Sequence, residues 1–278
     1  MKILALDTAT EACSVALLVD GHLVSREMEF ERGHAEHILS MVDAVLGEAG
    51  LVLNGLDALA FGRGPGGFTG VRLAASVTQG LAFAAELPVV GISNLAAVGQ
   101  RALDLAPEID RVIVCNDARM QEVYWACFER DAHGTAAMVG VEHVGAPGTV
   151  EVWPHWRTGA SATSREQDSS DSPPNRPTAS GQLPQRSVVT PRGARAGAIG
   201  AAGRGFRAYD ALRAKLLSSS TDPAPDHVKL ISDTLLPRAH EIAHLAVTEV
   251  KAGRLLPADQ AMPVYLRDDV ARPVPSRN

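Results

Sequence analysis

The chain has 278 residues, 46% of them hydrophobic, which is enough apolar material for a globular protein with two domains of ordinary size. Its formal net charge of -6 argues against broad electrostatic binding of nucleic acid, because that mode relies on clustered lysine and arginine. If RNA is involved, we expect a partner to carry most of the contact.

The cysteines and the N-terminus indicate the compartment. Cys13, Cys115 and Cys127 lie in apolar segments without a C-x-x-C pair, so they are expected to be reduced core residues. Asp7 interrupts the N-terminal apolar run too early for a signal peptide, and no charge-free run is long enough to cross a bilayer. We therefore expect a soluble, cytoplasmic protein with no membrane partner.

The first thirty residues have the pattern of a three-stranded meander. Apolar runs over residues 3–6 and 13–19 are followed by Asp20-Gly21, a strong hairpin signal, and then by a third run. Asp7 and Thr8 are therefore expected at the end of the first strand.

Residues 33–49 are expected to form a helix that ends at Gly50. The stripe expected to face its own sheet is Leu39, Val42, Leu46 and Ala49. The stripe expected to face outward is Ile38, Met41 and Val45. Two interpretations stay open: a deeply buried helix, or an outer stripe that contacts another protein.

A glycine-rich turn follows a short apolar strand and precedes an alanine-rich helix. Residues 62–70 contain five glycines, and the helix is expected over residues 71–85. The glycines fit G-x-G-x-x-G, but the next strand ends in Ser93 where a ribose-binding carboxylate is needed. Phe68 stands where a P-loop has its lysine. The turn either packs the helix tightly on the sheet or binds a ligand.

The opening pattern begins again after a strand at residues 88–92 and a helix at residues 94–105. An apolar strand over residues 112–115 leads to Asp117, followed by a returning strand and another hairpin signal. We therefore predict an α/β protein with mixed sheets and a duplicated, two-lobed fold. The lobes are expected to comprise residues 1–106 and 107–278.

The second half also contains segments without a counterpart in the first. Residues 157–187 are nearly devoid of large apolar side chains and are predicted to be a disordered insertion. The glycine-rich stretch 200–205 is expected to open a helix, and residues 236–251 to form an amphipathic helix. The tail over residues 262–267 is apolar enough to dock.

The titratable residues do not make a strong metal site. His34 and His37, like His240 and His244, lack a third ligand nearby, so no tightly bound metal is expected. A candidate nucleotide and Mg²⁺ cleft is formed by Asp7, Thr8, Asp117 and Gly203. The two aspartates could equally cap hairpins.

Four segments together resemble the bacterial TsaB family, also called YeaZ. They are residues 4–10 (LALDTAT), 64–72 (GPGGFTGVR), 117–124 (DARMQEVY) and 263–267 (PVYLR). The resemblance covers the chain to about residue 270 apart from the insertion. It implies the two-lobed fold of the actin, sugar kinase and Hsp70 group, built from ribonuclease H-like halves. It also implies a role in making the threonylcarbamoyladenosine of tRNA position 37.

The same resemblance implies a scaffold without catalytic residues. Such a subunit acts with TsaD and TsaE on tRNAs that read codons starting with A, and contacts tRNA only through the complex. TsaD carries a metal-binding H-x-x-x-H, whereas Asn94 and Val98 stand at the corresponding positions here. No cofactor is expected to be tightly bound, although the complex could use ATP or ADP with Mg²⁺.

The partner surface is expected on the two helices of the first lobe, with a homodimer competing when no partner is present. Its predicted residues are Ile38, Met41, Val45, Phe68, Thr69, Arg72, Leu73 and Ser76. Two other functions stay open. A small-molecule kinase would hold Mg-ATP with Asp7, Asp117 and the 200–205 loop. A metallopeptidase is disfavoured by the missing ligands.

Overall fold

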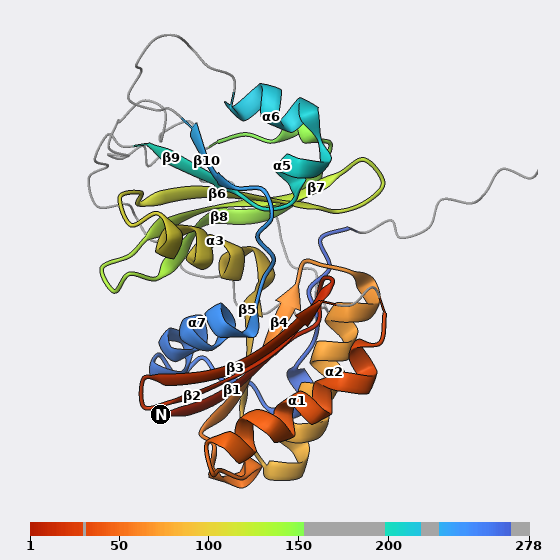
Figure 1. Ribbon diagram of the computed structural model, residues 1–278, viewed down its shortest axis with the longest axis vertical. Coiled ribbons are helices and arrows are strands. Elements are labelled where there is room, and N and C mark those ends of the chain that lie inside the picture. The colour runs from red at the N-terminus through yellow and green to blue at the C-terminus, as the bar shows by residue number, and fades with distance from the viewer. Residues whose placement is uncertain (30–31, 153–197, 218–227, 268–278) are drawn as a thin grey trace, which may run out of the picture.

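The computed structural model describes residues 1–29, 32–152, 198–217 and 228–267. These residues form two five-stranded mixed sheets, with helices between and outside the sheets (Figure 1). The insertion predicted at residues 157–187 lies outside the described residues. In the described ranges, no helix is both long enough and apolar enough to span a bilayer.

The first sheet has the strand order β3-β2-β1-β4-β5. Its strands are β1 (Lys2–Asp7), β2 (Ala12–Val19), β3 (His22–Glu29), β4 (Ala58–Gly64) and β5 (Val89–Ser93). β1 pairs with β2 antiparallel and with β4 parallel, so it is the central strand. The predicted hairpin between β2 and β3 is confirmed: Asp20 and Gly21 have φ of 48° and 91°, as a two-residue turn requires.

β1 is apolar from Ile3 to Leu6, where both of its faces are covered. Leu4 and Leu6 belong to the core under α1 (His34–Glu48) and α2 (Phe68–Ala85), whereas Ile3 and Ala5 belong to the core on the opposite face. A strand buried on both faces needs a continuous apolar run, not an alternating one. This is the pattern that ends at Asp7.

Helix α1 contradicts the predicted division into an inner and an outer stripe. Ile38, Met41 and Val45 are at most 5% exposed and pack in the core, together with Val42 and Leu46, and Leu39 is 51% exposed. The buried residues recur at i, i+3, i+4, i+7 and i+8, which is the single broad stripe of a helix lying on a sheet. The prediction that Ile38, Met41 and Val45 face outward is therefore wrong.

The second sheet repeats the first. Its order is β10-β9-β6-β7-β8, formed by β6 (Arg111–Asp117), β7 (Val123–Arg130), β8 (Ala136–Gly145), β9 (Ile199–Ala202) and β10 (Val228–Ser232). As in the first sheet, the central strand β6 is antiparallel to the next strand and parallel to a later one. The equal order and direction of the strands confirm the predicted duplication.

The segment after residue 198 differs from the prediction of a helix opened by a glycine loop. Residues Ile199–Ala202 form strand β9, and helix begins only at α5 (Gly205–Ala208), which is followed by α6 (Asp210–Leu217). Small residues suit this strand because Gly200 lies against Ile109 and Ile231. The predicted amphipathic helix is confirmed as α7 (Ala239–Lys251).

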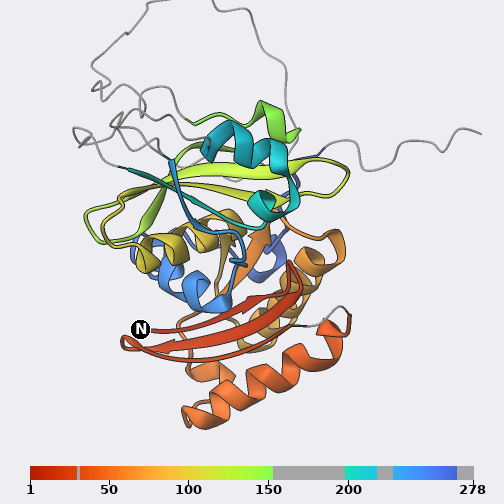
Figure 2. The same ribbon diagram turned by 45° about the horizontal axis from the view of Figure 1, so that its top comes forward.

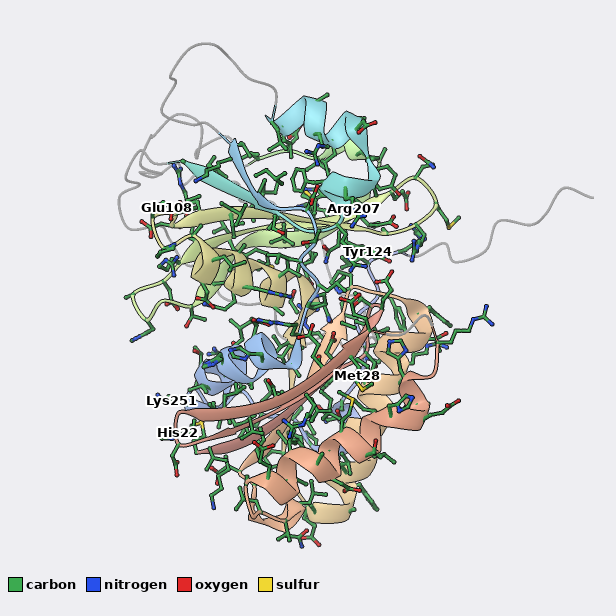
Figure 3. All side chains as sticks on the ribbon, viewed as in Figure 1. His22, Met28, Glu108, Tyr124, Arg207 and Lys251 are labelled. Atoms are coloured by element: carbon green, nitrogen blue, oxygen red, sulfur yellow. The ribbon has the colours of Figure 1, made fainter. Side chains whose placement is uncertain are left out.

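Two helices pack between the sheets and tie the halves together (Figure 2). α3 (Asn94–Leu105), which follows the first sheet, packs against β6, β7, β8 and β9, whereas α7 returns to pack against β1, β2, β4 and β5. Side chains from both lobes meet between α3 and α7 (Figure 3). The two lobes thus share one apolar core through this pair of helices.

Short 3₁₀ turns complete the described structure: η1 (Leu53–Gly55), η2 (Pro147–Thr149) and η3 (Ala258–Gln260). On the outer face of the second sheet, Phe206, Leu212 and Leu216 pack in a separate core. Cys13, Cys115 and Cys127 are all buried as thiols, which confirms their predicted place in the core.

Candidate functional site

The glycine turn between β4 and α2 is packed against the end of β1. Gly67 donates its backbone N–H to the carbonyl of Ala9 at 2.7 Å, and the Thr8 hydroxyl donates to the carbonyl of Gly70 at 2.6 Å. A Cβ on Gly70 would lie 2.0 Å from the Thr8 carbonyl oxygen, and one on Gly66 would lie 2.7 Å from that of Ala9. The glycines here allow close approach of two backbone segments.

Asp7 lies beside this turn, fully buried at the end of β1. Its Oδ1 accepts a hydrogen bond from Asn94 Nδ2 at 2.6 Å, and Asn94 Oδ1 accepts one from the backbone N–H of Gly64 at 2.7 Å. A Cβ on Gly62 would lie 2.0 Å from Asp7 Oδ1, so only glycine fits there. Asn94 thus joins the ends of β1 and β4, a role that the sequence pattern did not indicate.

The environment of Asp7 favours its protonated form. Burial raises the pKa of Asp7 from 3.8 to about 7, and the hydrogen bonds from Asn94 and from the backbone of Ala9 and Thr8 offset this only in part. Asp7 Oδ2 is buried without a hydrogen-bond partner in the described structure. A proton on this oxygen lowers the cost of burying the group.

Asp7 is expected to make the protein less stable as pH rises from about 4 to about 7. Its pKa is higher in the folded than in the unfolded chain, so its stabilising proton is lost as pH rises through the folded value. Asp7→Asn keeps an oxygen for Asn94 and cannot ionise. The free energy of unfolding in urea should be measured for both proteins at about pH 5 and about pH 8. The difference, variant minus wild type, should be larger at the higher pH. An equal free-energy difference at both pH values would contradict this prediction.

The corresponding strand end in the second lobe is built differently. Gly203 approaches Asn116, since a Cβ on this glycine would lie 2.5 Å from Asn116 Oδ1. Asp117, one residue further, accepts hydrogen bonds from the Arg119 backbone and the Tyr209 hydroxyl, both at 2.8 Å. Burial, and to a lesser extent the hydrogen bond to Asp117, raise the pKa of Tyr209 to about 12.

Ion pairs bridge the lobes near these strand ends. Glu11 of the first lobe lies 3.5 Å from Arg119 and 3.2 Å from Arg204, and Glu29 lies 3.7 Å from Arg204. Exposed pairs contribute little singly, but connected pairs restrain one another.

The residues predicted for a nucleotide cleft, Asp7, Thr8, Asp117 and Gly203, are all engaged in contacts within the protein. A nucleotide at this cleft stays a prediction.

The histidines that the structure describes do not gather into a metal site. His34 Nε2 lies 2.9 Å from the Thr10 carbonyl oxygen. The ring centroids of His240 and His244 are 5.1 Å apart. Burial lowers the pKa of His240. No group of three or more potential ligands lies together in the described part of the chain.

The outward face of α2 contains four of the residues predicted for a partner surface. Phe68, Thr69, Arg72 and Ser76 are exposed, and Leu73 is half-buried. On the same side of the first sheet, α1 exposes Leu39 in place of the three buried residues predicted there. Leu39 and Phe83, which is 82% exposed, were not predicted as partner residues.

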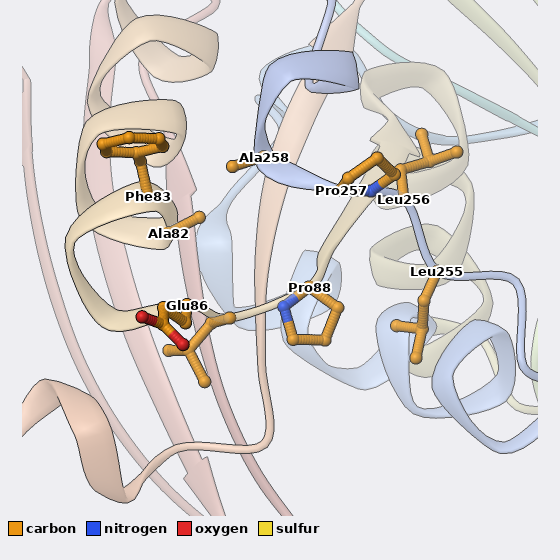
Figure 4. Close-up of a pocket in the computed structure, with 9 residues that line it drawn as sticks. Ala82, Phe83, Glu86, Pro88, Leu255, Leu256, Pro257 and Ala258 are labelled. Carbon is orange, nitrogen blue, oxygen red and sulfur yellow. The ribbon is translucent and has the colours of Figure 1, made fainter.

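A hollow of about 600 Å³ lies at the far end of α2 (Figure 4). Its lining is mostly apolar and comes from the end of α2, the segment between α2 and β5, and the segment that leads into η3. Phe83 borders it. It does not include Asp7 or Asp117, so it is separate from the strand ends described above.

The predicted docking of the C-terminal tail is confirmed. Val264 donates its backbone N–H to the carbonyl of Arg63 at 2.7 Å, next to the glycine turn. Arg267 forms an ion pair with Glu122 in the second lobe. The tail thus reaches from one lobe to the other.

This architecture is a two-lobed actin-like fold. A family model described as TsaD, tRNA N6-adenosine threonylcarbamoyltransferase, matches residues 28–150. Two solved Pseudomonas aeruginosa structures are similar over nearly their whole length. One is a protein with similarity to peptidase YeaZ (36% identical, TM-score 0.72, 96% of this chain and 99% of that chain). The other is YeaZ (35% identical, TM-score 0.71, 95% and 99%).

The chain belongs to the TsaB (YeaZ) family, as its sequence motifs indicated. The tRNA threonylcarbamoyladenosine biosynthesis protein TsaB of Haemophilus influenzae is 52% identical over 131 residues, which are 47% of this chain and 55% of that protein. The Escherichia coli TsaB is 49% identical over 134 residues, 48% of this chain and 58% of that protein. The aligned part therefore spans little more than half the length of these relatives.

Proposed function

We propose that this chain takes part in tRNA threonylcarbamoyladenosine biosynthesis as a non-catalytic subunit. The observation that carries the proposal is its membership of the TsaB family, whose Haemophilus influenzae and Escherichia coli members are named for this pathway. The TsaD-like family match over residues 28–150 supports descent from the same fold as the transferase. The net charge of -6 fits contact with tRNA through a partner, not directly.

The packing at the start of α3 supports the absence of catalysis. TsaD is expected to place metal-binding histidines where this chain has Asn94 and Val98. Asn94 is engaged by Asp7 and Gly64, and Val98 is 0% exposed in the core between the sheets. Neither side chain is available to a metal or a substrate, so the chain acts by organising a partner.

The partner in this proposal is a TsaD-like transferase, with TsaE joining the assembly. The exposed faces of α1 and α2 offer the docking surface, and small residues along α2 such as Ser76 and Gly80 allow close approach of another helix. The same surface can pair with a second copy when no partner is present. ATP or ADP with Mg²⁺ would act at the complex.

Depletion of this chain tests the proposed function. In cells whose gene is placed under a repressible promoter, threonylcarbamoyladenosine is expected to fall progressively in tRNA hydrolysed to nucleosides and measured by mass spectrometry. Re-expression of the wild-type chain should restore it, and an unrelated modified nucleoside serves as the internal control. Unchanged threonylcarbamoyladenosine after the protein has disappeared would contradict the proposal.

A further inference from the structure

The C-terminal strap, residues 261–267, is held at its middle and at its end. Its middle is fixed at the glycine turn by the bond from Val264 to Arg63, and a Cβ on Gly64 would lie 2.9 Å from the Val264 carbonyl oxygen. At its end, Arg267 donates to the Ala118 carbonyl at 3.2 Å in addition to its ion pair with Glu122. The strap therefore lies in a defined position beside the start of α2.

This position brings Tyr265 onto Arg72 and Phe68 of α2. The centre of the Arg72 guanidinium lies 3.6 Å from the centroid of the Phe68 ring and 5.5 Å from that of Tyr265. Arg72 Nε donates to the Tyr265 hydroxyl at 2.6 Å. Phe68 and Tyr265 are 48% and 47% exposed, so the cation that contacts both lies at the surface.

The guanidinium of Arg72 is held in place, and no described residue neutralises it. Among the described residues, no carboxylate lies within 4 Å of Arg72, whereas Arg63 and Arg267 nearby are paired with Glu142 and Glu122. The two terminal nitrogens of Arg72 keep a planar pair of donors that matches a carboxylate. Because the two rings and the tyrosine hydroxyl fix the plane, little side-chain entropy remains to be lost on binding.

We propose that Phe68, Arg72 and Tyr265 form a docking site for a carboxylate side chain of a protein partner. The proposal rests on the proposed function, because the partner is the TsaD-like subunit, and it adds the strap to the surface of α2. In the described part of this surface, a cation without a carboxylate partner among exposed apolar groups, including Met262, fits one acidic side chain in an apolar protein surface. Nucleic acid would need several clustered cations.

A calorimetric titration of this chain with the TsaD homologue of the same genome tests the site. Arg72→Lys keeps the charge but loses the planar pair of donors, and is expected to weaken binding about 30-fold. Tyr265→Phe keeps the ring but releases Arg72 Nε, and should weaken binding about threefold to tenfold. Tyr209→Phe is the matched control, because it removes another hydrogen-bonded hydroxyl in the second lobe. It should bind as wild type does.

The outcomes separate this inference from the proposed function. If wild type does not bind the TsaD homologue, the proposed partner is wrong. If wild type binds and both Arg72→Lys and Tyr265→Phe bind equally well, the carboxylate site is wrong. Urea unfolding of each variant serves as the folding control, since both changes concern exposed side chains and should leave the midpoint unchanged.

Discussion

Replacing Val45 with glutamate is expected to unfold the isolated protein. Val45 is 0% exposed and lies in the core between α1 and the first sheet, beside Ile38 and Val42. A carboxylate there has no described charged partner, and burying it costs about 4 kcal/mol or more. This is a large share of the roughly 5–15 kcal/mol by which a domain is stable. Soluble yield and circular dichroism measure the loss.

Leu39→Glu is the control on the same helix. Leu39 is 51% exposed, so a glutamate side chain at this position stays hydrated. The variant should unfold at nearly the same urea concentration as wild type. If both variants stay folded, Val45 does not lie in the core. If both unfold, the acidic side chain destabilises α1 irrespective of burial.

Replacing Gly70 with alanine is expected to destabilise the protein by at least about 3 kcal/mol. The added methyl group would lie 2.0 Å from the Thr8 carbonyl oxygen and 3.2 Å from Ala9 Cα. Both atoms belong to the backbone at the end of β1, so no side-chain rotation can relieve the overlap. Thermal unfolding should show a loss of roughly 6–12 °C.

Gly80→Ala on the same helix separates this overlap from helix propensity. A Cβ on Gly80 meets no atom within 4 Å in the described structure. Alanine in a helix interior is favoured over glycine by about 0.5–1 kcal/mol, so this variant should be slightly more stable than wild type. A Gly70→Ala variant as stable as Gly80→Ala would contradict the packing of the glycine turn against β1.

Local signals in the sequence predicted the parts of the fold that depend on neighbouring residues. The turn at Asp20-Gly21, the helix after the glycine turn and the repeated strand-hairpin pattern all follow from residues close in sequence. The same holds for helix α3, whose predicted bounds agree with the structure. Duplication could be predicted because its evidence is a recurrence of these local patterns.

The features that depend on distant partners were missed. Strand β9 has only four residues, and three of them, Gly200, Ala201 and Ala202, have little intrinsic preference for a strand. Its partners, β6 and β10, lie elsewhere in the chain. Helix α3 follows the first sheet but packs mainly on the second, and α7 follows the second but packs on the first. No local signal in the sequence indicates this arrangement. The face of α1 was misjudged because five adjoining apolar positions were divided into two stripes.

The candidate site was predictable only in part. Asp7 and the glycine turn were identified from the sequence, but the role of Asn94 depends on contacts with Asp7, 87 residues away, and with Gly64. Tyr265 lies 193 residues from Arg72, with which it shares a hydrogen bond. A single sequence contains no signal that relates residues so far apart.

The central proposal is that the chain is required for threonylcarbamoyladenosine synthesis without performing chemistry. Its most direct test is reconstitution from the purified chain, the TsaD and TsaE homologues, ATP, a threonylcarbamoyl donor and unmodified tRNA. The proposal predicts modified tRNA only when this chain is present, and nearly full activity when it carries Asp7→Asn and Asp117→Asn and is confirmed to be folded. Modification without the chain, or its loss with the folded double variant, would contradict the proposal.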